Sequence, residues 1–166
     1  MKRDRIFFII TALAVVIIDQ LSKIAVAGSI RYYESVPIID GILNLVHVRN
    51  RGMAFGLMNR PDDQLSSYYF VAATVIAIIL LILWFKSLKG GSRMLIFGLS
   101  LIVGGAIGNL IDRLRLKEVV DFIDFFIGKY HWPAFNLADS AISVGVFWVV
   151  INVLFFHSLN EKVKGE

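Results

Sequence analysis

Two aspartates of this chain stand in apolar stretches, where an ionised carboxylate is costly. Asp121 lies in "EVVDFIDFF" and Asp139 in "FNLADSAI", and neither has a basic residue beside it in the sequence. Two carboxylates brought together in such a setting cannot both ionise easily, so one pKa rises and the pair shares a proton. Such a pair can hydrolyse an amide, because the ionised member takes a proton from water while the protonated member polarises the carbonyl group.

The residues alone leave other interpretations of these aspartates open. Asp124 competes with Asp121, because a spacing of three residues would put both on one face of a helix. Asp121 and Asp139 would also be explained as interfacial aspartates that face water. They can meet only if the 18-residue interval between them loops out and returns, and "GKYHWP" suits such a loop.

Two further aspartates have basic neighbours, which favours a structural role. Asp19 precedes Lys23 by four residues, the spacing of a helical ion pair, and Asp112 is followed directly by Arg113. A cation makes a carboxylate tolerable near the membrane. We therefore interpret these four residues first as structural ion pairs.

Amide and glycine residues occur near the same places. Asn109 and Asn136 could orient the aspartates or a substrate backbone, or they could only cap helix ends. Gly104 and Gly108 form a small-xxx-small pair, which predicts close packing of two helices. The three histidines show no metal-ligand spacing and the chain has no cysteine, so we expect no metal and no cofactor.

Composition indicates the elements that must position these residues. The 166-residue chain is 57% hydrophobic and 18% charged, with a mean hydropathy of +0.73, which is too apolar for one soluble core of this size. Three uncharged runs of 17 or 18 residues and a longer N-terminal run approach the length of about 20 residues that spans a bilayer. We therefore predict a single integral membrane domain over residues 1–166. Its helices are expected at residues 6–27, 68–86, 94–111 and 139–157, with outer segments at 28–67 and 112–138.

The first of these segments also resembles a secretory signal. "MKRDR" is followed by 13 apolar residues, and "AVAG" imitates a small-residue cleavage site. The charged residues between the apolar run and Ala25 are unusual for a signal peptide, so we interpret the segment as a helix of the mature fold.

Charge predicts the orientation in the membrane. The two ends and the connection between the second and third helices carry eight Lys or Arg and three acids in 23 residues. By the positive-inside rule, these parts face the cytoplasm, and the two longer connections face outward. The net charge of +4 is then a topology signal, and we predict no nucleic-acid partner. Within the first outer segment, Asp40-Gly41 between alternating apolar residues predicts a β-hairpin on the membrane surface.

Five motifs together resemble the signal peptidase II (lipoprotein signal peptidase) family, in matching order along nearly the whole chain. The motifs are "DQLSK" from Asp19, "NRGMAFG" from Asn50, "GGAIGNLIDR" from Gly104, "VVDF" from Val119 and "FNLADSAI" from Phe135.

The resemblance implies an all-α membrane protein with four transmembrane helices, together with a small β-cradle and a short helix on the outer face. It implies a bacterial, multi-pass aspartic endopeptidase of the cytoplasmic (inner) membrane, with cytoplasmic termini and an active site near the outer face. The enzyme would remove the signal peptide from diacylglyceryl-modified prolipoproteins, cutting on the N-terminal side of the lipidated cysteine. We expect a monomer whose partners are these substrates and membrane lipid.

Residue by residue, the resemblance assigns the catalytic pair to Asp121 and Asp139, in preference to Asp124. It also implies a shell of residues that support the pair or bind substrate. The shell comprises Asp19, Lys23, Asn50, Gly52, Phe55, Asn109, Asp112, Arg113 and Asn136. We further expect the "NRGMAF" stretch to contact the substrate or to close over it.

Two other classes of protein remain as alternatives. A proton-coupled carrier also uses intramembrane carboxylates, but carriers place them near the bilayer midplane. A non-catalytic assembly subunit would use its small-residue faces for partner helices and would tolerate substitution of both aspartates.

Overall fold

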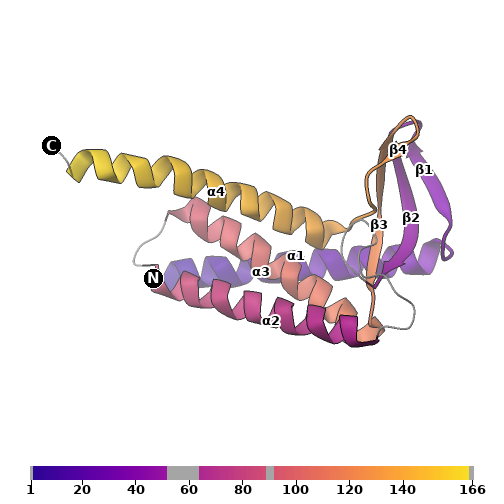
Figure 1. Ribbon diagram of the computed structural model, residues 1–166, viewed down its shortest axis with the longest axis horizontal. Helices are drawn as coiled ribbons and strands as arrows, with labels where there is room; N and C mark the ends of the chain where they lie inside the picture. The colour runs from indigo at the N-terminus through magenta and orange to yellow at the C-terminus, as the bar shows by residue number, and fades with distance from the viewer. Residues whose placement is uncertain (1, 52–63, 89–91, 165–166) are drawn as a thin grey trace.

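A computed structural model describes residues 2–51, 64–88 and 92–164 of the chain. This part contains four long helices, each apolar enough over sufficient length to cross a membrane. They are α1 (Lys2–Ser29), α2 (Gln64–Ser87), α3 (Arg93–Leu116) and α4 (Leu137–Lys164). The α3 helix packs against the other three (Figure 1). The predicted membrane protein with four spanning helices is therefore confirmed.

A small antiparallel sheet lies at one end of the bundle, where α1 ends and α4 begins (Figure 1). Its strands, in spatial as well as chain order, are β1 (Ser35–Ile39), β2 (Leu43–Asn50), β3 (Val119–Ile127) and β4 (Tyr130–His131). The predicted hairpin at Asp40-Gly41 joins β1 to β2, and Gly41 has the positive φ of 78° that such a turn requires.

The helices extend beyond the uncharged runs from which they were predicted. The α3 helix continues past Ile111 to Leu116, because the carboxylate of Asp112 is buried with polar partners and does not interrupt it. Lys117 closes α3 in the left-handed conformation, donating its backbone N–H to the carbonyl of Arg113. The described residues hold no helix besides these four, so the expected short outer helix is not seen in this part of the chain.

The first helix is an integral part of the bundle. It packs against α3 and α4, and it buries Asp19 and Lys23. Those two polar residues are the ones that fit a signal peptide poorly, and the fold uses them for contacts between helices. The interpretation of this segment as a helix of the mature fold is thus favoured over the secretory signal.

Glycines set the distance between the helices. A methyl group on Gly98 would lie 2.9 Å from the carbonyl oxygen of Gly145, and one on Gly104 would lie 2.8 Å from that of Ala12. The tightest approach to a backbone is at Gly105, where the added carbon would lie 2.4 Å from the carbonyl oxygen of Ala138. The small residues therefore let the backbones of α1, α3 and α4 touch, as the small-residue pattern predicts.

We predict that Gly105→Ala lowers the stability of the fold. The obstructing atom is backbone, so α3 and the start of α4 must separate, and overpacking of this kind costs about 1–3 kcal/mol. Thermal unfolding in detergent should show a lower midpoint. Gly28→Ala is the matched control, because nothing lies within 4 Å of its added carbon. Equal midpoints for the two variants would contradict the prediction.

Candidate active site

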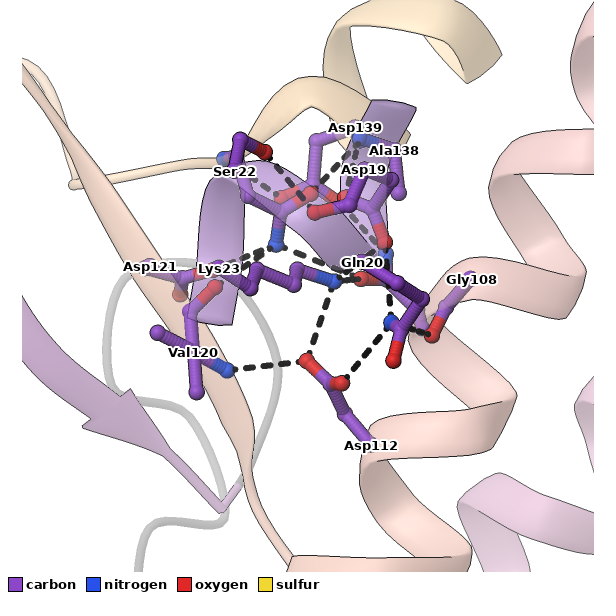
Figure 2. A network of polar contacts seen from close by, with 12 residues as sticks. Asp19, Gln20, Ser22, Lys23, Gly108, Asp112, Val120, Asp121, Ala138 and Asp139 are labelled. Atoms are coloured by element: carbon purple, nitrogen blue, oxygen red, sulfur yellow. Dashed lines mark hydrogen bonds and ion pairs between the residues drawn. The ribbon is translucent and has the colours of Figure 1, made fainter. Parts of the chain in front are cut away.

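The sheet and the start of α4 bring the two aspartates together. Asp121 lies on β3, and the chain then turns back through the hairpin between β3 and β4, as the loop prediction required. Phe135 next pairs with β3, since it accepts the N–H groups of Phe122 and Ile123 and donates its own to Ile123. This pairing places the beginning of α4, and with it Asp139, beside the Asp121 segment (Figure 2).

Asn136 contacts both aspartates with one side chain. Its Oδ1 accepts the backbone N–H of Asp139 at 3.0 Å. The backbone N–H of Asn136 in turn donates to Asp139 Oδ2 at 3.3 Å, so the two residues form a reciprocal N-cap of α4. Its Nδ2 donates to Asp121 Oδ1 at 2.7 Å. Asn136 therefore does both things predicted for it, because it caps the helix and orients the pair.

Two other amides hold the remaining carboxylate oxygens. Asn109 donates from Nδ2 to Asp139 Oδ1 at 2.8 Å, and Asn50 donates to Asp121 Oδ2 at 3.2 Å. Asn109 lies inside α3, so the helix-cap interpretation is wrong for this residue. All four oxygens of the pair thus face N–H donors.

A buried ammonium group supports these amides. Lys23 Nζ lies 2.9 Å from Asp19 Oδ2 and 3.0 Å from Asp112 Oδ2 (Figure 2). It also donates to Asn109 Oδ1 at 2.9 Å. The helical pair of Asp19 with Lys23 is confirmed. Asp112 forms its ion pair with Lys23 and not with the adjacent Arg113, because successive residues of a helix point in different directions.

The two structural aspartates also hold the backbone beside the catalytic candidates. Asp19 Oδ1 accepts the N–H of Ala138, the residue before Asp139. Asp112 Oδ2 accepts the N–H of Val120, the residue before Asp121. The network therefore ties α1 and α3 to both segments that carry the pair (Figure 2).

Gln20 belongs to this network, although the sequence analysis gave it no role. Its Nε2 donates to Asp112 Oδ1 at 3.0 Å, to the carbonyl oxygen of Gly108 at 3.1 Å and to Asp19 Oδ2 at 3.2 Å. The available signal was an uncharged amide beside Asp19 in an apolar helix, where a polar group needs partners.

A cavity of about 720 Å³ opens beside the pair. Polar residues from β2, α3, β3 and α4 line one part of it: Asn50, Asn109, Arg113, Asp121 and Asp139. Apolar residues line the rest, including Trp132, Pro133, Phe135, Ile142 and Val144. The cavity can hold a peptide bond at its polar part and apolar side chains along the remainder.

Arg113 brings a positive charge to this cavity. Its guanidinium group lies over the ring of Phe70 on α2, 5.3 Å from the ring centroid. It is half-buried and lines the cavity with the two aspartates. A substrate carbonyl group in the cavity would therefore find a nearby hydrogen-bond donor.

Asp121 is the more deeply buried member of the pair, at 3% exposure. Burial first, and then the neighbouring charge of Asp139, raise its pKa to about 7, although hydrogen bonds from Asn50 and Asn136 act in the opposite direction. A carboxyl group with this pKa can hold a proton near neutral pH. The pair can thus contain one carboxylic acid and one carboxylate.

Asp124 points away from the pair. Because residues 119–127 form a strand, a spacing of three places Asp121 and Asp124 on opposite faces, so the prediction that they share a helical face is wrong. Asp124 instead accepts hydrogen bonds from Asn44 at 3.0 Å and contacts His131 Nδ1 at 2.8 Å. It does not line the cavity.

Some predicted site residues fall elsewhere. Gly52 and Phe55 lie outside the described residues, so their predicted roles stay predictions. Within residues 2–51, 64–88 and 92–164, no group of three or more His, Asp or Glu is arranged to hold a metal ion.

These features define a multi-pass membrane protein with two aspartates sharing one cavity. The family model described as signal peptidase (SPase) II matches residues 11–155. The chain therefore belongs to the signal peptidase II family and is a bacterial membrane protease.

Individual relatives show the same similarity. A lipoprotein signal peptidase of Syntrophus aciditrophicus is 42% identical, covering 93% of this chain and 96% of the relative. One of Oleidesulfovibrio alaskensis is 47% identical, covering 91% and 97%. A solved bacterial membrane enzyme superposes with a TM-score of 0.80 at 34% identity, covering 90% of this chain and 93% of that structure.

The raised pKa of Asp121 predicts a pH-dependent stability. Between the ordinary value of 3.8 and about 7, the folded chain binds more protons at this residue than the unfolded chain. Stability conferred by Asp121 is therefore present at low pH and is lost as pH rises through this range. Relative to Asp121→Asn, the wild type should lose up to about 1.4 kcal/mol per pH unit.

Thermal unfolding of both proteins in detergent from pH 4 to pH 8 measures this difference. Groups far from the pair titrate equally in both proteins, so the gap between the two curves reports Asp121 and its interaction with Asp139. Parallel curves would show that Asp121 has an ordinary pKa.

Proposed function

We propose that the protein is a lipoprotein signal peptidase that works as an aspartic endopeptidase. Its substrate is a diacylglyceryl-modified prolipoprotein, and it cuts on the N-terminal side of the lipidated cysteine. The observation that carries the proposal is the joint contact of Asn136 with Asp121 and Asp139 at one cavity. The names of the similar proteins support the choice of substrate.

In the proposed reaction, the pair holds one proton and activates a water molecule. The ionised carboxylate removes a proton from the water molecule while the water oxygen forms a bond to the scissile carbonyl carbon. The protonated carboxyl group gives its proton to the carbonyl oxygen, which forms a tetrahedral intermediate. The carbon–nitrogen bond then breaks as the carboxyl group that took the proton from water passes it to the leaving amine. One hydroxyl group of the intermediate returns its proton to the other carboxylate, which yields the product carboxyl group and restores the pair with one proton.

The amides keep the pair in position for this chemistry. Asn109, Asn136 and Asn50 hold the four carboxylate oxygens at fixed directions. Two carboxyl groups held in this way lose little orientational freedom when substrate binds, which lowers the barrier. We propose that Arg113 and Asn50 also contact the substrate backbone, since both line the cavity.

The place of the site fits a substrate that lies in the membrane. Asp121 lies on β3 and Asp139 in the first turn of α4. These elements meet at the sheet end of the bundle, opposite the end where α1 begins and α4 ends (Figure 1). By the charge pattern, the sheet end faces outward and the termini are cytoplasmic. A signal helix would reach its lipid-bearing cysteine at that interface. A proton-coupled carrier would need its carboxylates near the bilayer midplane, whereas this pair lies at one end of the helices.

The protein is proposed to work as a monomer in contact with membrane lipid. The residues assigned to the pair and its described support come from one chain, from α1, β2, α3, β3 and α4. No residue of a second copy is needed to complete the polar side of the cavity.

We predict that Asp121→Asn and Asp139→Asn each lower cleavage by about 100-fold or more, because an amide keeps the shape but removes the acid or base. Purified protein in detergent is incubated with a diacylglyceryl-modified prolipoprotein, and signal-peptide release is followed by gel shift. Asp124→Asn is the matched control and should cleave normally, because Asp124 faces away from the pair. Retained activity in either pair variant would refute the proposed pair.

We also predict that the cleavage rate falls as pH rises above about 7. The pair needs one proton, and Asp121 has a pKa of about 7 in the folded protein. Loss of that proton should lower kcat/KM by about tenfold for each further pH unit. Initial rates from pH 5 to pH 9 measure the profile. A rate that stays constant to pH 9 would exclude a shared proton with this pKa.

A further inference from the structure

We propose that the buried ammonium group of Lys23 decides which aspartate acts as acid and which as base. Through Asn109 it directs an amide donor at Asp139, so Asp139 is the ionised base and Asp121 carries the shared proton. This inference rests on the proposed function. Lys23 itself is a positioning residue, since its close partners are Asn109, Asp19 and Asp112, and Asn109 is the one that contacts the pair.

Lys23 sets the donor-to-acceptor direction of the hydrogen bonds that lead to the pair. An ammonium group has only donors, so the atom 2.9 Å from Nζ must be the oxygen of the Asn109 amide. The ammonium has three protons, and its three close partners are Asn109, Asp19 and Asp112. At 2% exposure Lys23 has little freedom to turn elsewhere. The orientation of Asn109 is therefore fixed by chemistry.

The fixed amide determines what Asp139 receives. With its oxygen toward Lys23, Asn109 must present its nitrogen to Asp139 Oδ1, at 2.8 Å. The other oxygen, Oδ2, faces the backbone N–H of Asn136 at 3.3 Å. Neither donor can accept a proton from a carboxylic acid. Asp139 also lies in the first turn of α4, where the helix dipole favours a negative charge. Its surroundings are thus those of a carboxylate.

Asn136 is fixed in the same way. Its oxygen faces the backbone N–H of Asp139, and its nitrogen faces Asn109 Oδ1 at 3.2 Å and the carbonyl oxygen of Val120 at 3.3 Å. The nitrogen also donates to Asp121 Oδ1. Asp121 Oδ1 is consequently an acceptor, and the oxygen of Asp121 that remains for the shared proton is Oδ2.

The surroundings of Asp121 Oδ2 permit that proton. The Asn50 amide lies 3.2 Å from it and donates its N–H when Asp121 is ionised. Turned by half a rotation, the same amide presents its oxygen and accepts a proton from Oδ2. Asp121 is on a strand and has no helix dipole. The charged groups acting on it are Lys23 from α1, Arg113 from α3 and Asp139 from α4. Burial raises its pKa to about 7, which agrees with the assignment.

The test follows the two carboxyl groups directly, without substrate. Full-length protein with ¹³C-labelled aspartate carboxyl groups is titrated in detergent by NMR, and Asp121→Asn and Asp139→Asn assign the two signals. In the wild type, Asp121 should stay protonated to a pH near 7 while Asp139 is ionised. A wild type in which Asp139 holds the proton at pH 6 overturns the inference.

Lys23→Met tests the role of the ammonium group. Removal of the ammonium charge by itself acts on both aspartates together, whereas an Asn109 amide that is free to turn takes a donor from Asp139 alone. We expect the gap between the midpoints to narrow by on the order of one pH unit. Lys23→Arg should restore the gap, because it keeps the charge and the donors. An unchanged gap in Lys23→Met overturns the role of Lys23.

Gln20→Met is the matched control, because the Gln20 amide donates to Asp19, Gly108 and Asp112 and does not orient Asn109. The gap between the titration midpoints of the two aspartates in Gln20→Met should equal that of the wild type. If Lys23→Met does not fold, Lys23→Met with Asp112→Asn removes one positive and one negative charge together and is titrated in its place. Cleavage is measured on the same samples to separate this inference from the proposed function. If the wild type cleaves through the proposed pair but Asp139 holds the proton, only the assignment of acid and base is wrong.

Discussion

An ammonium group buried in an apolar bundle is stable only when acceptors satisfy all its N–H groups, and Lys23 has such a set of acceptors. Two carboxylates and one amide oxygen lie within 3.0 Å of its Nζ atom. Removing one partner from a buried pair costs about 3–5 kcal/mol, because the other charge is left unpaired. The helices α1 and α3 are therefore locked in one register. Through Asp19 and Asp112 the same group also holds the two backbone segments that carry Asp121 and Asp139.

That polar centre depends on the close approach of the helices around it. Gly108 brings α3 against Asp19, where a methyl group would lie 2.5 Å from the carboxylate, and Gly105 brings α3 against the start of α4. Without a hydrophobic driving force between helices in lipid, close packing and buried hydrogen bonds hold the bundle together. Packing and charge thus support each other. The glycines admit the polar groups, and the polar groups fix the helices.

The sheet has a different role, because it carries Asp121, the one member of the pair that does not lie on a helix. Asp121 lies on β3, held between β2 and the returning chain at Phe135. Its side chain can face the start of α4 only because a strand places alternate residues on opposite sides, which also directs Asp124 away toward His131. The site is therefore a junction between a rigid bundle and a small sheet.

By itself, the sequence determined the membrane class, close helix packing at Gly104 and Gly108, the Asp40-Gly41 hairpin and the ion pair of Asp19 with Lys23. These follow from hydropathy and from contacts a few residues apart, which the order of residues records. Only the tertiary structure decided that Asp112 pairs with Lys23, that Asn109 orients Asp139 and that Asp124 faces away. Each of those outcomes depends on groups up to about ninety positions apart in the chain, or on the choice of strand over helix for residues 119–127. Such contacts are set by how the elements pack, and local pattern does not encode them.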